Sequence, residues 1–374
     1  MSILFAPINI KNMELRNRFV RSATCDGWAD TDGHVTDRQV RFFTELAQGG
    51  VGLIVVGITY VHHSGQIIVS QNSIASDGCI AGFKRLTTVV QGHGAKIALQ
   101  LFHAGRNRAE ILRGKDIVAI SPSYIQNDPY FPKKYRSMNE DEIWDVINAF
   151  GDGAKRAREA GFDAVQLHAA HAFLPSQFLS PYTNRRTDGW GGPLTNRLRF
   201  HREIYRNMRS KVGDDYPLLI KIGVQDGFSR GLEFSEGKIA AQLVAEWGFD
   251  ALEISSGLRG DGYEASEFRT KIDRLDREGY FRDWCKQVKS QVSVPVMMVG
   301  GLRTFELMEE IIQKHEADFI SLSRPLINNP YIINEWLSDR RRRAGCISCN
   351  KCLEALIDGE GLSCKLPMTK TKES

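Results

Sequence analysis

Residues 140–171 read EDEIWDVINAFGDGAKRAREAGFDAVQLHAAH, and this stretch decides the fold. Its first part places apolar residues at helical spacing and ends at Gly161, as helix C-termini often do. A short, mainly apolar run follows at 164–169, which is typical of a strand buried on both faces of a parallel sheet. The stretch therefore predicts one helix–strand unit of an α/β fold, with polar side chains where the strand ends.

The same unit recurs along the chain. Amphipathic helical patterns also occupy 37–50 and 235–248, and they alternate with strand-like runs. These runs are 18–23, 52–57, 96–101, 164–169, 217–222, 251–256, 295–300 and 318–323. Eight such units predict a (β/α)8 TIM barrel. A doubly wound open sheet is the alternative, but no dinucleotide-type glycine pattern follows the first strand.

We expect the barrel to occupy residues 1–340, followed by a cysteine-rich extension at 341–374. Residues 4–17 predict a short hairpin lid before the first strand. Residues 103–135 form a long insert, rich in Pro, Tyr and Asn, after the third strand. Long loops at this end of a barrel strand usually cover an active site.

Composition is that of an ordinary soluble globular protein, with 25% charged residues and a net charge of +4. No basic stripe interleaved with aromatic residues suggests nucleic acid, and no apolar run is long enough to cross a bilayer. The N-terminus lacks a signal-peptide pattern. We therefore expect a cytoplasmic protein. The basic run at 339–346, DRRRRAGC, is either a solvated helix end or a docking point for an anionic ligand or protein.

Chemistry in a TIM barrel sits at the C-terminal ends of the strands. These ends form a ring of hydroxyl, amide, imidazole, ammonium and guanidinium groups with few carboxylates. In chain order they give Ser22, Ala23, Thr24, Cys25, Gly57, Ile58, Thr59, Gln100, His103, His168, His171, Lys221, Ser255, Ser256, Gly300, Gly301, Ser323 and Arg324. Such a ring suits an anionic ligand with many hydrogen-bonding groups.

The last two strand ends predict a phosphate site. Gly300 and Gly301 offer backbone N–H groups at a helix start, which bind anions well. Arg324 adds a guanidinium at the matching position of the next strand. A tight turn is the alternative explanation for the glycine pair alone.

His168 and His171 permit three interpretations. A zinc site would need a third ligand, which His103 could supply, but the pair lacks the usual i, i+4 spacing and an intervening glutamate. A hydrogen-bonded structural pair is the second interpretation. The third is a pair of imidazole donors aimed at a substrate oxygen, which would stabilise developing negative charge.

These residues carry a family resemblance. Residues 167–200, LHAAHAFLPSQFLSPYTNRRTDGWGGPLTNRLRF, resemble a long motif of the Old Yellow Enzyme family of flavin oxidoreductases. The opening LFAPINIKNMELRNRFVRSAT at 4–24 and QLFHAGR at 100–106 resemble the family's first and third strands. The similarity runs from about residue 3 to 340 and on into the cysteine tail.

The resemblance implies FMN as cofactor and NADH or NADPH as reductant. Lys221 matches the position whose cation stabilises negative charge on the flavin, and Gln100 the position that bonds its pyrimidine end. His168 and His171 would bind the substrate oxygen. The other implied cofactor contacts are Ala23, Thr24, Cys25 and Ile58 beside the ring, and Gly300, Gly301, Ser323 and Arg324 at the phosphate.

One position departs from the family pattern. The family's usual proton donor is a tyrosine two residues after the second histidine, and here that residue is Phe173. Phenylalanine has no proton to give, so reduction of an activated C=C would need another source. Nitro or quinone reduction, slow alkene reduction and substrate oxidation therefore stay open. Tyr60, Tyr124, Tyr130 and Tyr182 are tyrosines that the sequence does not place.

The cysteine tail reads CISCNKCLEALIDGEGLSC at 346–364. Three closely spaced cysteines with a distant fourth fit a 4Fe–4S cluster held by Cys346, Cys349, Cys352 and Cys364. Zinc and free thiols are the alternatives. The tail resembles the cluster segment of dienoyl-CoA reductases and trimethylamine dehydrogenase, in which two dinucleotide-binding domains follow the barrel. From the chain's end we expect those domains to be absent here.

We therefore predict an FMN-dependent oxidoreductase that acts on an unsaturated or carbonyl-bearing small molecule. The alternative is an electron-transfer flavin and iron–sulfur subunit that serves a partner enzyme and has weak alkene reductase activity. If the cluster is present, its electrons must come from a separate electron-donor protein or from the medium, and association into a homo-oligomer stays open.

Overall fold

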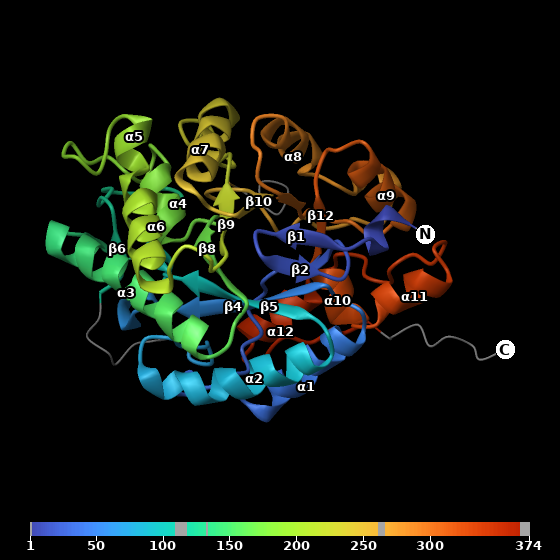
Figure 1. The fold of residues 1–374 in the computed structure, drawn as a ribbon. Coiled ribbons are helices and arrows are strands. Elements are labelled where there is room, and N and C mark those ends of the chain that lie inside the picture. Colours follow the sequence, from blue (N-terminus) through green and yellow to red (C-terminus); the bar gives the residue numbers. More distant parts are fainter. Residues whose placement is uncertain (1, 109–117, 132–133, 261–265, 367–374) are drawn as a thin grey trace.

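A computed structural model describes residues 2–108, 118–131, 134–260 and 266–366. Its central element is a closed barrel in which each strand pairs in parallel with its neighbours (Figure 1). The barrel strands are β3 (Phe19–Arg21), β4 (Leu53–Tyr60), β5 (Lys96–Phe102), β8 (Ala164–Ala169), β9 (Leu218–Gly223), β10 (Ala251–Ser255), β11 (Val296–Met298) and β12 (Phe319–Leu322). Each overlaps its predicted run, so the predicted TIM barrel is confirmed.

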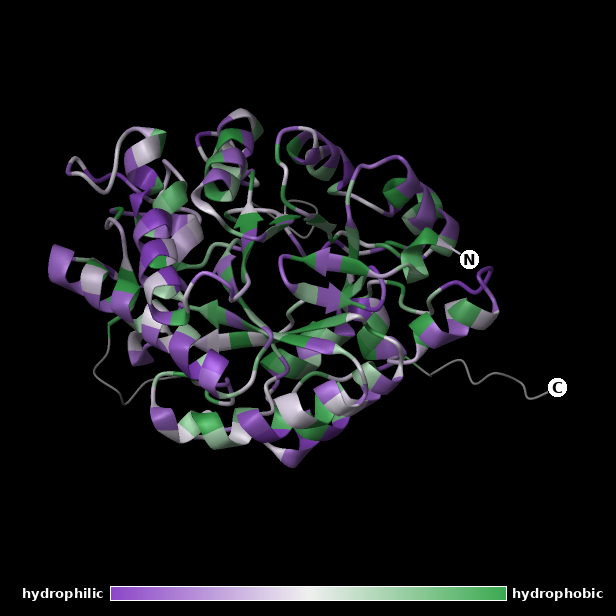
Figure 2. Cartoon of the chain, viewed as in Figure 1, coloured by the Kyte–Doolittle hydropathy of each residue, from purple (hydrophilic) through white to green (hydrophobic). Residues whose placement is uncertain are grey.

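Helices alternate with these strands and surround the barrel. They are α1 (Asp37–Gln48), α2 (Ile80–Gly92), α3 (Glu140–Glu159), α6 (Arg199–Val212), α7 (Phe234–Trp247), α8 (Arg282–Lys289), α9 (Phe305–Gln313) and α11 (Ile332–Ser338). Shorter helices are α4 (Leu174–Leu179), α5 (Leu194–Arg197), α10 (Arg324–Asn328) and α12 (Lys351–Ile357). Figure 2 shows the strands mainly in apolar colours and the outer helix faces mainly in polar ones, so the barrel and the helices' inner faces form the core.

Side chains inside the barrel alternate with those that face the helices, because successive residues of a strand point to opposite sides. The lower interior is apolar and includes Leu53, Ala98, Ala164 and Leu219. One step up, the same inward positions turn polar. Gln100, Gln166, Lys221 and Glu253 stand two residues after apolar positions of their strands and are buried. The barrel therefore carries a polar layer just below its C-terminal end.

The predicted hairpin is present as β1 (Ile8–Ile10) paired antiparallel with β2 (Met13–Leu15). Ile10, Met13 and Leu15 pack against the first residues of the barrel strands. Figure 1 shows the hairpin lying across the barrel opening. The hairpin therefore closes the N-terminal end of the barrel, opposite the strand ends that carry the candidate chemistry. Its apolar side chains pack there because the lower interior of the barrel is apolar.

The long insert after β5 lies partly outside the described residues, at 109–117 and 132–133. Its described part contains β6 (Ile120–Ser121), which pairs in parallel with β7 (Arg136–Ser137). A buried ion pair between Arg106 and Asp128, 2.5 Å apart, fixes the insert, and Tyr182 donates to the same carboxylate at 2.8 Å. This contact holds Tyr182 against the insert.

Within the described residues, no helix combines the length and the apolar composition needed to cross a membrane.

A buried histidine on α6 gives the fold a pH dependence. His201 has no exposed surface, and neither ring nitrogen has a hydrogen-bond partner in the described part of the chain. Burial lowers its pKa to about 3. In the unfolded chain the imidazole takes up a proton near its ordinary pKa of about 6.5. Its contribution to stability is therefore complete above about pH 6.5 and is lost as the pH falls toward 3.

We predict that wild-type protein loses about 2 kcal/mol between about pH 7 and about pH 5 through His201 alone. The variant His201→Leu cannot take up this proton, so its loss over the same interval should be smaller by that amount. Urea unfolding at the two pH values measures both. An equal pH dependence in the two proteins would show that His201 is protonated in the folded state.

Candidate active site

The C-terminal ends of the barrel strands surround a cavity, here called the barrel-top cavity. Ten of the twelve residues predicted for catalysis and cofactor binding line it: Ala23, Thr24, Cys25, Ile58, His168, His171, Lys221, Gly301, Ser323 and Arg324. Gln100 lies in the polar layer beneath the cavity, and Gly300 lies beside it with its carbonyl bonded by Gly279 and Tyr280. The structure therefore gathers the predicted residues at one end of the barrel.

His168 is positioned as a hydrogen-bond donor toward the cavity. It is the last inward-facing residue of β8, and its Nδ1 accepts a hydrogen bond from the backbone N–H of Ala170 at 3.3 Å. Nδ1 therefore carries no proton, and Nε2 must carry one in the neutral ring. Burial, and then the nearby His171 and Lys221, hold the pKa of His168 well below its usual range. A neutral imidazole with a fixed N–H donor results.

His171 is held on both sides by the chain. Its Nε2 lies 2.7 Å from Ser255 Oγ, and its Nδ1 lies 3.8 Å from a carboxylate oxygen of Glu267. A carboxylate facing Nδ1 favours a proton there, so the Ser255 hydroxyl donates to Nε2. Burial and the cations Lys221 and Arg259 hold the pKa of His171 well below its usual range. The two histidines thus have different surroundings, which their sequence spacing did not reveal.

Phe173 packs directly against the histidine pair. Its ring lies edge-on to His168 at 4.9 Å and to Phe102 at 4.4 Å. It also lines the barrel-top cavity. Of the tyrosines left unplaced by the sequence, none is among the described residues that line this cavity, whereas Tyr280 is. The Tyr280 hydroxyl donates to the backbone carbonyl of Glu267 at 3.1 Å.

The loop after β10 adds a charged pair that the sequence analysis missed. Arg259 and Glu267 line the cavity and form a two-pronged ion pair, with the closest atoms 2.5 Å apart. The Arg259 guanidinium also lies 5.8 Å from the Phe173 ring. A loop arginine and glutamate eight residues apart carry no sequence pattern that would place them together, and only their loop's position after a barrel strand could have suggested them.

Cys25 and the residues predicted to bind the phosphate are influenced or bonded by neighbouring residues of the chain. Burial, and then Asp26, raise the pKa of Cys25 to about 12, so the residue is a neutral thiol. Thr24 and Ser323 share a hydrogen bond of 2.8 Å. Arg324 donates to the side-chain oxygen of Asn350 at 2.7 Å while still lining the cavity. The predicted anion-binding groups are therefore held in fixed positions.

The cysteine tail forms part of the cavity wall. Cys352 lines it together with Leu353, Leu356 and Leu362. Burial, and then the sulfur of Cys346, raise the pKa of Cys352, and Cys364 and Cys349 act in the same direction while Arg324 opposes them. The other three cysteines therefore lie near Cys352. All seven cysteines are free thiols, and the described residues contain no group of three or more His, Cys, Asp or Glu side chains arranged to hold a metal ion.

Arg303 joins the tail to the barrel. Its buried guanidinium donates to the carbonyls of Gly301 and Cys346 and to Ser348 Oγ at 2.5 Å. It also lies 3.6 Å from the sulfur of Cys346. The sequence analysis assigned Arg303 no role. Its donors fix the glycine turn and the first cysteine relative to one another.

Comparison with known proteins gives the family. The model of the family described as "NADH:flavin oxidoreductase / NADH oxidase family" matches residues 3–342. The chain belongs to this family. The resemblance predicted from the sequence is thereby confirmed.

Two curated relatives and one solved structure show the extent of the similarity. An NADH oxidase of Thermoanaerobacter brockii is 35% identical over 93% of this chain and 52% of its own length. An NADPH dehydrogenase of Bacillus subtilis (strain 168) is 35% identical over 88% of this chain and 92% of its own. A 2-naphthoyl-CoA reductase complex is 27% identical with a TM-score of 0.85, covering 94% of this chain and 54% of that one. The chain thus spans about half the length of the first of these relatives.

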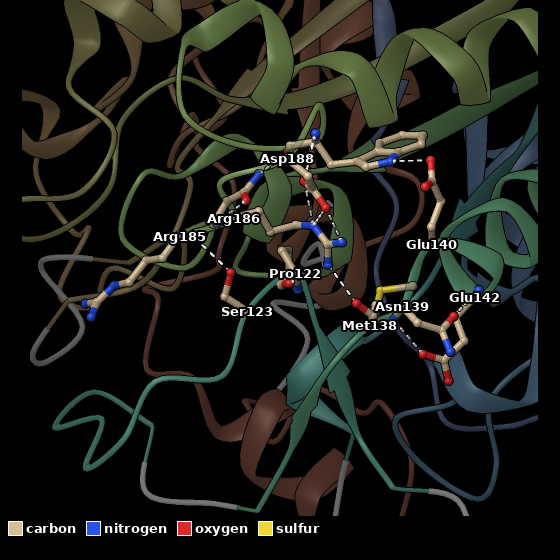
Figure 3. Close-up of polar contacts among 11 residues, drawn as sticks. Pro122, Ser123, Met138, Asn139, Glu140, Glu142, Arg185, Arg186 and Asp188 are labelled. Carbon is tan, nitrogen blue, oxygen red and sulfur yellow. Dashed lines mark hydrogen bonds and ion pairs between the residues drawn. The ribbon is translucent and has the colours of Figure 1, made fainter.

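The second half of the family motif, after the histidines, is structural. Figure 3 shows Arg186 between two segments, where it donates to the carbonyls of Pro122 at 3.1 Å and Met138 at 2.6 Å. Asp188 accepts from the same guanidinium at 2.6 Å. Trp190 donates to Glu140 at the start of α3 at 3.0 Å. These contacts tie the loop after α4 to the insert and to α3.

We predict that Arg186→Met lowers the free energy of unfolding by about 2–3 kcal/mol, because two carbonyls and a carboxylate lose a charged donor. The matched change at the neighbouring Arg185 should cost less, since the Arg185 side chain points away from this network in Figure 3. Denaturant unfolding of both variants provides the measurement. Equal losses would mean that Arg186 does not hold the two segments together.

Proposed function

We propose that this chain is an FMN-dependent NAD(P)H oxidoreductase that transfers hydride between reduced flavin and an unsaturated or carbonyl-bearing small molecule. The observation that carries the proposal is the barrel-top cavity, which combines the fixed donor of His168 with the cations Lys221 and Arg324 in a barrel of this family. FMN, when bound, supplies the hydride chemistry, while the protein supplies binding, orientation and charge.

The residues present fit FMN. Gln100 Oε1 and Ser321 Oγ are buried and lack a hydrogen-bond partner among the described residues, so each is available for a hydrogen bond with a ligand. The cavity's ammonium, guanidinium and imidazole donors suit a phosphate and a ring with carbonyl acceptors. We propose that Gln100 and Lys221 hold the pyrimidine end. Ala23, Thr24, Cys25 and Ile58 would line the ring, and Gly300, Gly301, Ser323 and Arg324 would hold the phosphate.

The proposed substrate contact is made by His168. Its Nε2–H would donate to a carbonyl or nitro oxygen and stabilise the negative charge that develops there. His171, steadied by Ser255 and facing Glu267, would complete the oxygen's surroundings. Because the pKa values of both imidazoles lie well below the usual range, both rings are neutral at ordinary pH, and the free N–H donor is that of His168.

The missing phenol generates a prediction. Phe173→Tyr would place a hydroxyl on a ring that already lies 4.9 Å from His168. We predict that alkene reduction of an enone rises by at least about tenfold, because a positioned general acid contributes that much or more. Ferricyanide, which needs no proton at carbon, serves as the matched oxidant and should show no change. An unchanged enone rate would count against a proton-limited step.

We propose that Cys346, Cys349, Cys352 and Cys364 hold a 4Fe–4S cluster. Their spacing in the sequence and the nearness of the other three cysteines to Cys352 support this assignment. Arg303 near Cys346 and Asn328, which donates to Cys364 at 3.4 Å, supply the hydrogen bonds that such sulfurs receive. When bound, the cluster would supply one-electron chemistry. Zinc and free thiols remain the alternatives, and the test below separates the cluster from both.

The second candidate function is an electron-transfer subunit that serves a partner enzyme. Two observations favour it: Phe173 in place of a proton donor, and Cys352 in the wall of the barrel-top cavity. A separate electron-donor protein would be its partner. Rapid stopped-flow reoxidation by any of a panel of enones would exclude a pure electron carrier.

We also propose a cytoplasmic location, supported by the seven cysteines, none of which forms a disulfide in the described residues. The proposed substrate is a small molecule, and neither nucleic acid nor a membrane is a proposed partner. Association into a homo-oligomer remains a proposal without a defined surface.

The first test is an absorption spectrum of protein purified without oxygen, with flavin and iron assayed on the same sample. We predict flavin bands, a broad iron–sulfur shoulder and about four irons per chain. The quadruple replacement of the tail cysteines by serine is the control, and it should lose the iron and the shoulder. Flavin without iron would reduce the tail to zinc or free thiols, and absence of flavin would overturn the proposed function.

A further inference from the structure

A chain of buried polar groups lies directly below the barrel-top cavity. Gln100, Gln166, Lys221 and Glu253 come from four adjacent strands, β5, β8, β9 and β10, and Ser22 follows β3. Each is at most 3% exposed. Gln100 donates to Gln166 at 2.7 Å, and Gln166 donates to Glu253 at 3.0 Å. Glu253 lies between Leu252 and Ile254 in the middle of β10, and its carboxylate is fully buried.

The carboxylate dictates the direction of this chain. An ionised carboxylate only accepts hydrogen bonds, so Gln166 must turn its NH2 group toward Glu253. Its carbonyl oxygen then faces Gln100 and can only accept. Gln100 must therefore present its own NH2 group to Gln166 and its oxygen elsewhere. That oxygen, Gln100 Oε1, is the buried atom without a partner among the described residues.

The carboxylate oxygen of Glu253 that does not accept from Gln166, Oε1, forms an ion pair with Lys221. The Lys221 ammonium lies 3.4 Å from Glu253 Oε1 and donates to Ser22 Oγ at 3.0 Å. Ser22 in turn donates to the same carboxylate oxygen at 2.7 Å. Lys221 lines the cavity, whereas Glu253 does not. The carboxylate thus reduces, from below, the positive charge that the ammonium presents to a ligand.

We propose that Glu253 is a positioning residue for the flavin ring, which rests on the proposed FMN site. Through Gln166 it fixes Gln100 as an acceptor for a ligand N–H group, and through Lys221 it limits the stabilisation of negative charge on the ring. The first action supports affinity and selects a ligand edge with a donor. The second holds the reduction potential of the bound flavin lower than Lys221 alone would set it.

Two variants separate these actions. Gln166→Leu interrupts the relay and keeps the Lys221–Glu253 pair, so FMN should bind about tenfold more weakly with little change of potential. Glu253→Gln removes the charge, so the midpoint potential of bound flavin should move in the positive direction. Titration of FMN into deflavinated protein, followed by flavin fluorescence, gives the affinity. Anaerobic redox titration of the holoprotein gives the potential.

Glu316→Gln is the matched control, because Glu316 is a buried carboxylate paired with Arg282 outside the barrel. It should leave both quantities at their wild-type values. Unchanged affinity in Gln166→Leu, or an unchanged potential in Glu253→Gln, would overturn the corresponding action. Should Glu253→Gln fail to fold, Glu253→Asp draws the carboxylate back from the Lys221 ammonium and should move the potential in the same direction. Wild-type protein that takes up no FMN would instead refute the proposed function.

Discussion

Closure of the barrel is the constraint on which the site depends. Eight parallel strands, with helices outside, leave an interior that only alternate side chains can fill. The apolar side chains of the hairpin and of the strand starts seal the lower part, so water is excluded from below. Polar groups at the upper positions must therefore satisfy one another or a ligand. Lys221, buried at 3% exposure, has a carboxylate and a hydroxyl as partners, as an ion in such surroundings requires.

The sequence predicted the parts of this arrangement that follow from periodicity. Apolar runs bounded by glycine located the strands, and their ends located His168, Lys221 and Arg324. Periodicity does not rank polar residues inside a run, so Glu253 in ALEISS passed as an ordinary strand residue. Arg259 and Glu267 depend on how the loop after β10 folds back, which no local pattern encodes. Local patterns also could not predict which end of the barrel the hairpin closes, because this depends on which layer of the barrel interior is apolar.

The tail shows how a boundary in composition differs from a boundary in structure. Residue 340 separates a barrel-like sequence from a cysteine-rich one, yet Arg303 and Arg324 of the barrel donate to Ser348 and Asn350 of the tail. Ser348 and Asn350 adopt left-handed backbone angles, with φ of 54° and 61°, and such strain persists where surrounding contacts hold it. The cavity wall that contains Cys352 therefore depends on the arginines that also border the predicted phosphate corner.

The charges in the cavity limit the chemistry that the proposed function can perform unaided. His168 is a neutral donor, His171 is neutral, and the Glu267 carboxylate is paired with Arg259. None of these is a strong acid, and Phe173 has no acidic proton to donate. A substrate whose reduction places protons on oxygen or nitrogen can exchange them with water, whereas an alkene needs a proton at carbon, where exchange from water is slow without a positioned acid. For the proposed function, these groups therefore suit nitro or quinone acceptors better than enones.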